Sequence, residues 1–209
     1  MKKFFVAVVI LGFAAGVSAQ VPTTPESQKP GVQPGTSATQ QGSSRNPSAA
    51  SATAAAGDPA AIYDRAFSSF ERKVISLAEA MPAEKYNFAP TNGEFTGVMT
   101  FADQMKHLTE ELYYFFGSQS GEKADEAAIK NAKTKDEILA NYHKALEMAH
   151  QTIRKMTAEN AFQPIPGARG GATPAGMATA AIGDGYDHYG QLVEYLRMNG
   201  IVPPASRKK

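Results

Sequence analysis

The sequence predicts an all-α fold, and three observations support that prediction. Four segments carry apolar residues three and four positions apart, which is the spacing of an amphipathic helix. Each of these segments begins at a threonine or aspartate of the type that caps helices. No segment of the folded region shows the alternation of apolar and polar residues that marks a half-buried strand.

The predicted helices span residues 59–81, 101–117, 135–158 and 174–199. Their N-cap residues are Asp58, Thr100, Thr134 and Thr173. A proline follows two of these caps and suits the first helical turn, because its missing N–H has no partner there. A glutamate three residues after Thr134 completes a capping box. Pro82, Gly117 and Gly200 mark predicted helix ends.

The spacing of the helices predicts how they connect. The predicted loops of about 15–20 residues are longer than the few residues that join neighbouring helices of a plain up-and-down bundle. We therefore expect residues 58–204 to form one domain, a four-helix bundle with a crossed connection. Residues 205–209 would follow it as a short basic tail.

The N-terminus predicts the compartment. Lys2 and Lys3 precede the apolar run from Phe4 to Val17, and small residues lie at the positions that signal peptidases recognise before Ala19. We expect residues 1–19 to be a cleaved signal peptide and the mature protein to be secreted or periplasmic. The apolar run is shorter than the roughly 20 residues of a membrane-spanning helix. No integral membrane segment is therefore expected after cleavage.

A linker is predicted between the signal peptide and the domain. Residues 20–57 are rich in Pro, Ser, Thr, Gln and Ala and have no aromatic residue, so they cannot bury enough apolar surface to offset their chain entropy. Cleavage after Ala19 would leave 19 basic and 20 acidic residues, a balance that does not favour nucleic acid as a partner. The chain has no cysteine, which excludes disulfides, thiolate nucleophiles and cysteine-based metal sites.

The last predicted helix contains the clearest chemical signal. Asp184 and His188 are four residues apart, so both lie on one face of that helix and could hold one cation. A third ligand would complete such a site, and His107 on the second helix is the candidate. The alternative for His107 is a hydrogen-bonded histidine at the edge of the core, and the alternative for His188 is a buried, packed histidine. A solvated carboxylate is the alternative for Asp184.

The segments 80–90, 101–108, 188–192 and 195–204 together resemble the DinB/YfiT-like superfamily of helical-bundle metalloenzymes. The resemblance implies a four-helix bundle with a crossed connection, frequently a homodimer, that holds a divalent metal, zinc or nickel in many members. It implies His107 and His188 as ligands, with Asp184 where the family has a further histidine. Two imidazoles and a carboxylate suit zinc, iron or manganese.

Two further residues lie beside the predicted ligands. Gln191, about one turn beyond His188, is expected to support that histidine by hydrogen bonding, with ordinary helix packing as the alternative. Glu111, one turn beyond His107, is expected in the same supporting shell, with a solvated acidic face as the alternative. His143 and His150 match no position of the family's ligands and are expected at the surface or the edge of the core.

Two classes of function remain open from the sequence. One is a metal-dependent transferase or hydrolase acting on an unidentified small molecule, with the metal as a Lewis acid. The other is a non-catalytic binding or envelope-associated module whose metal is structural or absent. The sequence contains no Gly-x-Ser-x-Gly, His-Glu-x-x-His or dinucleotide-binding motif, so serine-hydrolase, zincin and Rossmann chemistry are not supported.

Overall fold

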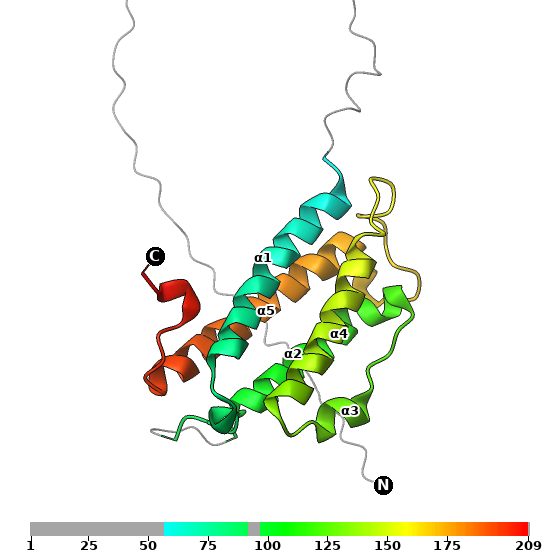
Figure 1. Ribbon diagram of the computed structural model, residues 1–209. Helices are drawn as coiled ribbons and strands as arrows, with labels where there is room; N and C mark the ends of the chain where they lie inside the picture. Colours follow the sequence, from blue (N-terminus) through cyan, green and yellow to red (C-terminus); the bar gives the residue numbers. More distant parts are fainter. Residues whose placement is uncertain (1–56, 92–96, 209) are drawn as a thin grey trace, which may run out of the picture. The chain divides into compact units, whose positions relative to one another are not determined.

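The computed structural model describes residues 57–91 and 97–208, and this part of the chain is all-helical, with no strand (Figure 1). The five α-helices are α1 (Pro59–Ala80), α2 (Phe101–Ser120), α3 (Glu126–Asn131), α4 (Lys135–Ile153) and α5 (Pro174–Met198). The described residues also contain three short 3₁₀ turns, η3 (Ala83–Lys85), η4 (Arg169–Gly171) and η5 (Pro204–Ser206). The all-α prediction is confirmed for these residues. The predicted signal peptide at 1–19 and all but the last residue of the linker at 20–57 lie outside them.

The four predicted N-caps are confirmed. The Asp58 side chain accepts a hydrogen bond from the backbone N–H of Ala60, and the hydroxyl oxygens of Thr100 and Thr173 each accept one from the N–H three residues on. Thr134 and Glu137 form both hydrogen bonds of the capping box at the start of α4. Local side-chain chemistry therefore sets where these helices begin.

Two predicted helix ends are wrong, and one helix was not predicted. α2 continues through Gly117 to Ser120, and it ends where Gly121 adopts the left-handed conformation (φ 80°) that glycine tolerates best. α4 ends at Ile153 rather than at residue 158. Beyond it, Thr157 and Asn160 close a turn by reciprocal hydrogen bonds that compete with helix. The six-residue helix α3 lies in a stretch that was predicted to be a loop.

The four long helices pack around a shared core, in which α1 and α2 each contact both α4 and α5. The Nζ of Lys135, the first residue of α4, donates to the carbonyls of Glu79 (2.7 Å) and Met81 (2.8 Å) at the end of α1. The N–H of Phe101, the first residue of α2, bonds the carbonyl of Phe88 just beyond that same end. α2 and α4 therefore start at the same end of the domain and run in the same direction, and the segment containing α3 returns the chain between them (Figure 1).

The core lies between these helices and is built largely from aromatic and long aliphatic side chains. Its largest fully buried members include Tyr142, Phe67, Phe70, Phe101, Phe116 and Leu77. The contact between α1 and α5 depends on Gly185, because a Cβ atom there would lie 2.3 Å from the Phe70 ring. Among the described helices, none combines the length and hydropathy that crossing a membrane requires.

Candidate metal centre

Three possible metal ligands meet between α2 and α5. His107 and Glu111 lie one turn apart on α2, and His188 faces them from α5. Each offers one ligand atom, and these atoms all lie within 4.8 Å of one another. Glu111 Oε1 is 2.9 Å from His107 Nε2 and 3.5 Å from His188 Nε2, and the two imidazole centroids are 5.0 Å apart. The structure thus brings together both predicted histidines with Glu111, which was expected only in a supporting position.

Burial differs among the three side chains. Their exposed fractions are 35% for His107, 18% for Glu111 and 12% for His188. A hydrogen bond with Glu111 raises the pKa of His188, although burial opposes that shift. Burial alone would raise the pKa of Glu111, but hydrogen bonds with His188 and Asp184 and the nearby charge of His107 outweigh it and lower the pKa. The glutamate is therefore the anionic centre of the group.

Asp184 lies next to Glu111 but is not one of the three residues whose ligand atoms lie within 4.8 Å of one another. Burial and a hydrogen bond with Glu111 raise the pKa of Asp184 to about 6. The pKa of Asp184 is raised and that of Glu111 is lowered, so a proton taken up by this carboxyl pair as pH falls would go to Asp184 first. The predicted role of Asp184 as a metal ligand stays a prediction.

Two carboxylate oxygens of this site have no hydrogen-bond donor among the described residues. They are Glu111 Oε2 and Asp184 Oδ2, and both are buried. An unpaired buried acceptor is costly, and a cation or a shared proton would remove that cost. Imidazole and carboxylate groups are ordinary ligands of zinc, iron and manganese, so this residue set fits a divalent metal.

Comparison with known families adds a second line of evidence. The family model of the DinB superfamily matches residues 66–192, which include all four residues of the site. The chain belongs to the DinB superfamily. No curated protein matches the chain in sequence. In this DinB protein the match runs from within α1 into the last third of α5, so it includes the whole of α2 and the part of α5 that carries the site.

The site of this DinB protein is reachable from solvent on the His107 side. A surface hollow of about 600 Å³ borders that histidine, between α2 and the segment that contains α3. Charged residues of both signs line it, namely Asp103, Lys106, Glu110, Glu126 and Lys130. A small polar molecule therefore has room beside one of the candidate ligands.

Gln191 reaches His188 only indirectly, through a residue that the sequence analysis did not select. His188 Nδ1 lies 2.6 Å from Gln104 Oε1, and Gln104 Nε2 donates to Gln191 Oε1 at 2.7 Å. Gln104 lies one turn before His107 on α2, so the helical period alone could have indicated it. The sequence does not show that it faces α5, because that depends on how the two helices pack.

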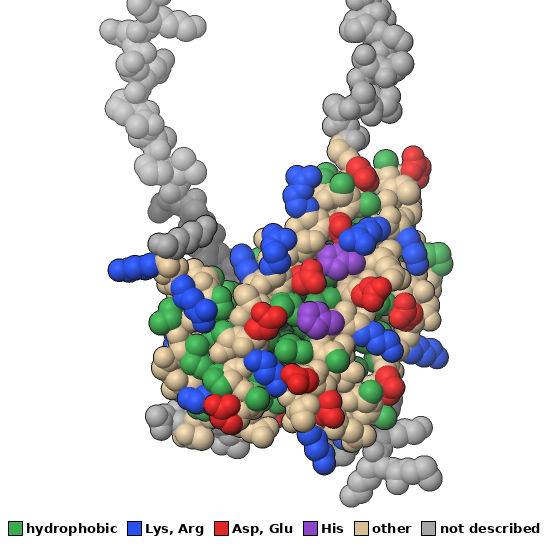
Figure 2. All heavy atoms as spheres, viewed as in Figure 1, with side chains coloured by type: hydrophobic (Ala, Val, Ile, Leu, Met, Phe, Trp, Pro, Cys, Tyr) green, Lys and Arg blue, Asp and Glu red, His purple; other side chains and the backbone are tan. Residues whose placement is uncertain are grey.

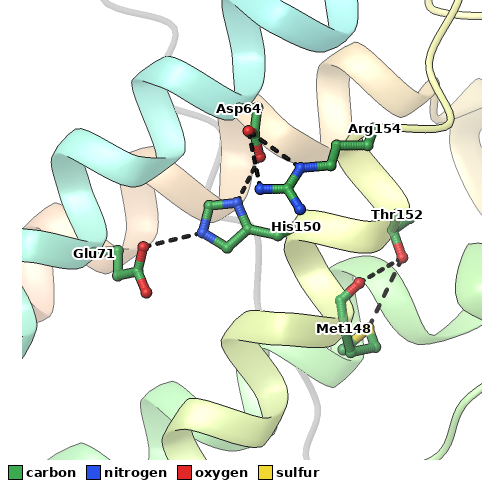
Figure 3. Close-up of polar contacts among 6 residues, drawn as sticks. All are labelled: Asp64, Glu71, Met148, His150, Thr152 and Arg154. Atoms are coloured by element: carbon green, nitrogen blue, oxygen red, sulfur yellow. Dashed lines mark hydrogen bonds and ion pairs between the residues drawn. The ribbon is translucent and has the colours of Figure 1, made fainter.

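A second histidine cluster joins α1 to α4 (Figure 3). His150 Nδ1 lies 2.5 Å from Asp64 Oδ1, and His150 Nε2 lies 3.0 Å from Glu71 Oε2. The guanidinium of Arg154 contacts the other oxygen of Asp64 at 3.3 Å. His150 is thus at the edge of the core, as expected, whereas His143 is exposed. The view of this face in Figure 2 shows histidine side chains among acidic and basic ones.

Proposed function

We propose that this chain is a metal-dependent transferase or hydrolase of the DinB superfamily that acts on a small molecule. His107, Glu111 and His188 would hold a divalent metal, with Asp184 as a fourth ligand or as the hydrogen-bond partner of Glu111. One observation carries the proposal: three ligand atoms lie within 4.8 Å of one another beside two buried carboxylate oxygens that have no donor in the described part of the chain.

Zinc is the first choice of metal, with iron, manganese and nickel as alternatives. Two imidazoles with one carboxylate is a familiar ligand set of catalytic zinc, in which a fourth position stays open for water or substrate. A second carboxylate would shift the preference toward harder ions such as manganese or iron(II). The residue at 184 therefore bears on the identity of the metal.

The chemistry at such a site would combine the metal with the protein's own groups. When bound, a divalent metal would act as a Lewis acid on an oxygen or sulfur of the substrate. Glu111 and Asp184 would exchange a proton beside it, because Glu111 raises the pKa of the neighbouring Asp184 carboxyl group to about 6. The hollow beside His107 would receive the substrate, and its lysines and carboxylates favour a polar molecule.

The ligand assignment is tested by metal stoichiometry and affinity. We expect the purified protein to bind close to one equivalent of zinc, and His107→Ala and His188→Ala to abolish that binding while helical content by circular dichroism is retained. His150→Ala is the matched control, since it removes a histidine of similar burial from the other cluster. Unchanged zinc binding in both site variants would refute the assignment.

An enzyme differs from a structural module in that its metal keeps a coordination position that water or a small ligand can occupy. In the cobalt(II)-substituted protein we expect the visible absorption spectrum to change when azide or a small thiol is added, because an open position accepts the added ligand. A spectrum that no small ligand alters would indicate a closed, structural site and favour the non-catalytic module.

The remaining expectations concern architecture and location. We propose that α1, α2, α4 and α5 form a four-helix bundle with a crossed connection, that residues 1–19 direct export to the periplasm or the medium, and that the domain forms a homodimer. The parallel course of α2 and α4 supports the crossed connection. Mass spectrometry of exported protein would locate the cleavage site, and sedimentation would give the assembly state.

A further inference from the structure

Gln104 is unusual among the buried residues of this protein. Of the described residues, only Gln104, Thr109 and Thr152 are polar and buried, and Gln104 is 3% exposed. The two threonine hydroxyls donate to carbonyls one turn earlier in their own helices, which is ordinary for threonine. Gln104 instead uses its amide to connect two side chains of another helix. A buried amide with that connection calls for an explanation.

The amide belongs to a chain of hydrogen bonds that starts at the surface. Gln191 Nε2 donates to Asp187 Oδ2 at 2.8 Å, and Gln104 Nε2 donates to Gln191 Oε1 at 2.7 Å. His188 Nδ1 lies 2.6 Å from Gln104 Oε1 and ends the chain. Three of these residues are on α5, and Gln104 reaches them from α2.

Asp187, at the surface end of this series of hydrogen bonds, determines which group donates and which accepts in each of them. An ionised carboxylate only accepts, so Asp187 requires the NH₂ group of Gln191. Gln191 must then present its oxygen to Gln104, which must turn its own NH₂ outward and its oxygen toward His188. An amide oxygen also only accepts, so Nδ1 of His188 has to carry a hydrogen. The nitrogen left for a cation is Nε2, which is the one that faces Glu111.

Tyr195 supports the same orientation of the Gln104 amide. The Tyr195 hydroxyl donates to the carbonyl of Met99 at 2.9 Å, which leaves its oxygen free to accept. Burial raises the pKa of Tyr195, and hydrogen bonding from Gln104 counteracts part of that shift. The NH₂ end of Gln104 thus has Gln191 Oε1 as its acceptor, with the Tyr195 hydroxyl nearby, and the oxygen end is left to His188.

We propose that Gln104, held in place by Gln191 and Asp187, is a positioning residue that keeps His188 in the Nδ1–H tautomer with the Nε2 lone pair directed into the metal site. The inference rests on the proposed function, since it assigns a role in metal binding. Second partners of metal-bound histidines commonly contribute 10–100-fold to affinity by fixing tautomer and ring orientation.

Zinc affinity, measured by competition with a chromophoric chelator, tests the proposal. Gln104→Leu keeps the size of the side chain and removes the acceptor, so we expect zinc to bind about 10–100-fold more weakly. Gln104→Glu keeps an acceptor for Nδ1–H and should bind within a few-fold of the wild type. Thr109→Val is the matched control on the same helix and should bind as the wild type does. Equal affinity in Gln104→Leu and the wild type would overturn the proposal.

A second measurement needs no metal. At about pH 9, above the ordinary histidine pKa of roughly 6.5, the ¹⁵N shifts of His188 in chelator-treated protein should report the Nδ1–H tautomer. In Gln104→Leu they should move toward the Nε2–H tautomer, in which the ring donates to Glu111. If Gln104→Leu does not fold, the exposed Gln191→Leu replaces it, with a smaller shift expected.

The two readouts separate the possible failures. A wild-type protein that binds no zinc but shows the Nδ1–H tautomer would contradict the proposed function and leave the positioning role of Gln104 standing. A wild-type protein that binds zinc while His188 is in the Nε2–H tautomer without metal, or keeps the same tautomer in Gln104→Leu, would contradict the positioning role alone.

Discussion

The two histidine clusters of this protein use similar residues and have opposite character. His150 has both ring nitrogens occupied by carboxylates, and Arg154 balances part of their charge. His188 has one nitrogen occupied by an amide, while the other faces Glu111 across 3.5 Å. The second cluster also contains two buried carboxylate oxygens with no donor among the described residues, whereas no atom of the first is in that position.

This difference separates a complete ion cluster from an incomplete one. In the α1–α4 cluster every ring nitrogen has a partner, so a metal would have to displace existing ion pairs. In the α2–α5 site a metal would also displace contacts, those of Glu111 with the two histidines, but it would satisfy two buried acceptors that are otherwise unpaired. Burial and residue type alone do not distinguish the two, since His150 and His188 are each 12% exposed.

Loss of a metal ligand should change zinc affinity more than any other substitution changes stability. His188→Ala should weaken zinc binding by more than about 100-fold, because it removes a direct ligand rather than an outer partner. Zinc at 100 times its Kd should stabilise the wild type by about 2.7 kcal/mol and this variant hardly at all, since binding acts only on the native state. Differential scanning calorimetry with zinc and with chelator measures both. If His188→Ala lowers the free energy of unfolding as much in chelator as in zinc, the histidine has a purely structural role.

The second effect concerns the fold without metal. His150→Ala leaves Asp64 and Glu71 near each other with no imidazole between them, so we expect the free energy of unfolding to fall by about 2 kcal/mol. The exposed His143, on the same helix, is the matched control, and His143→Ala should stay within about 0.5 kcal/mol of the wild type. Urea denaturation in chelator measures the difference. A loss in His150→Ala no larger than the control's would show that the cluster does not stabilise the α1–α4 contact.

A third prediction follows from the pKa of Asp184, which is raised to about 6. Its ordinary value is 3.8, so the folded protein binds more protons than the unfolded chain between these pH values, and stability falls as pH rises through them. In chelator, Asp184→Asn should therefore be more stable than the wild type at pH 7 by about 1–2 kcal/mol, after allowance for partial exposure. The advantage should disappear near pH 4. A variant that is less stable at pH 7 would show that the ionised aspartate is favoured in the fold.

Asp64, in the α1–α4 cluster, should make the smallest contribution to the pH dependence of stability, and its sign is opposite to that of Asp184. Burial would raise the pKa of Asp64, but the hydrogen bond and charge of His150 and the nearby Arg154 outweigh it and lower the pKa. The stabilisation by Asp64 is thus present above the ordinary carboxyl pKa and is lost as pH falls through the lower folded value. At pH 6 the free energy of unfolding of the wild type should be higher than that of Asp64→Asn, by less than about 1 kcal/mol. Acid denaturation curves that do not converge below pH 4 would contradict this assignment.

The sequence predicted the helices well because their signals are local. Thr134 and Glu137 cap α4 through atoms three residues apart, and that arrangement can be recognised from the sequence alone. The end of α2 was predicted at residue 117 instead of Ser120, because glycine is tolerated inside a helix as well as at its end. α3 has only six residues, too few for a periodic apolar pattern to be recognised.

The two histidines of the site could be predicted because their signal, too, lies in the sequence. His107 and His188 carry the family's pattern, and the structure brings them together. The central place of Glu111 and the role of Gln104 depend on which face α2 turns toward α5. That is a property of helix packing, which the spacing of residues within either helix does not determine. The proximity of the Glu111 and Asp184 carboxyl groups also depends on helix packing, since the two residues lie on different helices.

Anomalous X-ray diffraction from crystals of the zinc-soaked protein, recorded on either side of the zinc absorption edge, would show whether a metal binds between α2 and α5. We expect one strong peak within about 2.0–2.2 Å of His107 Nε2, His188 Nε2 and a carboxylate oxygen of Glu111 or Asp184, and no peak beside His150. A peak between Asp64 and Glu71, or no ordered zinc between α2 and α5, would contradict this expectation.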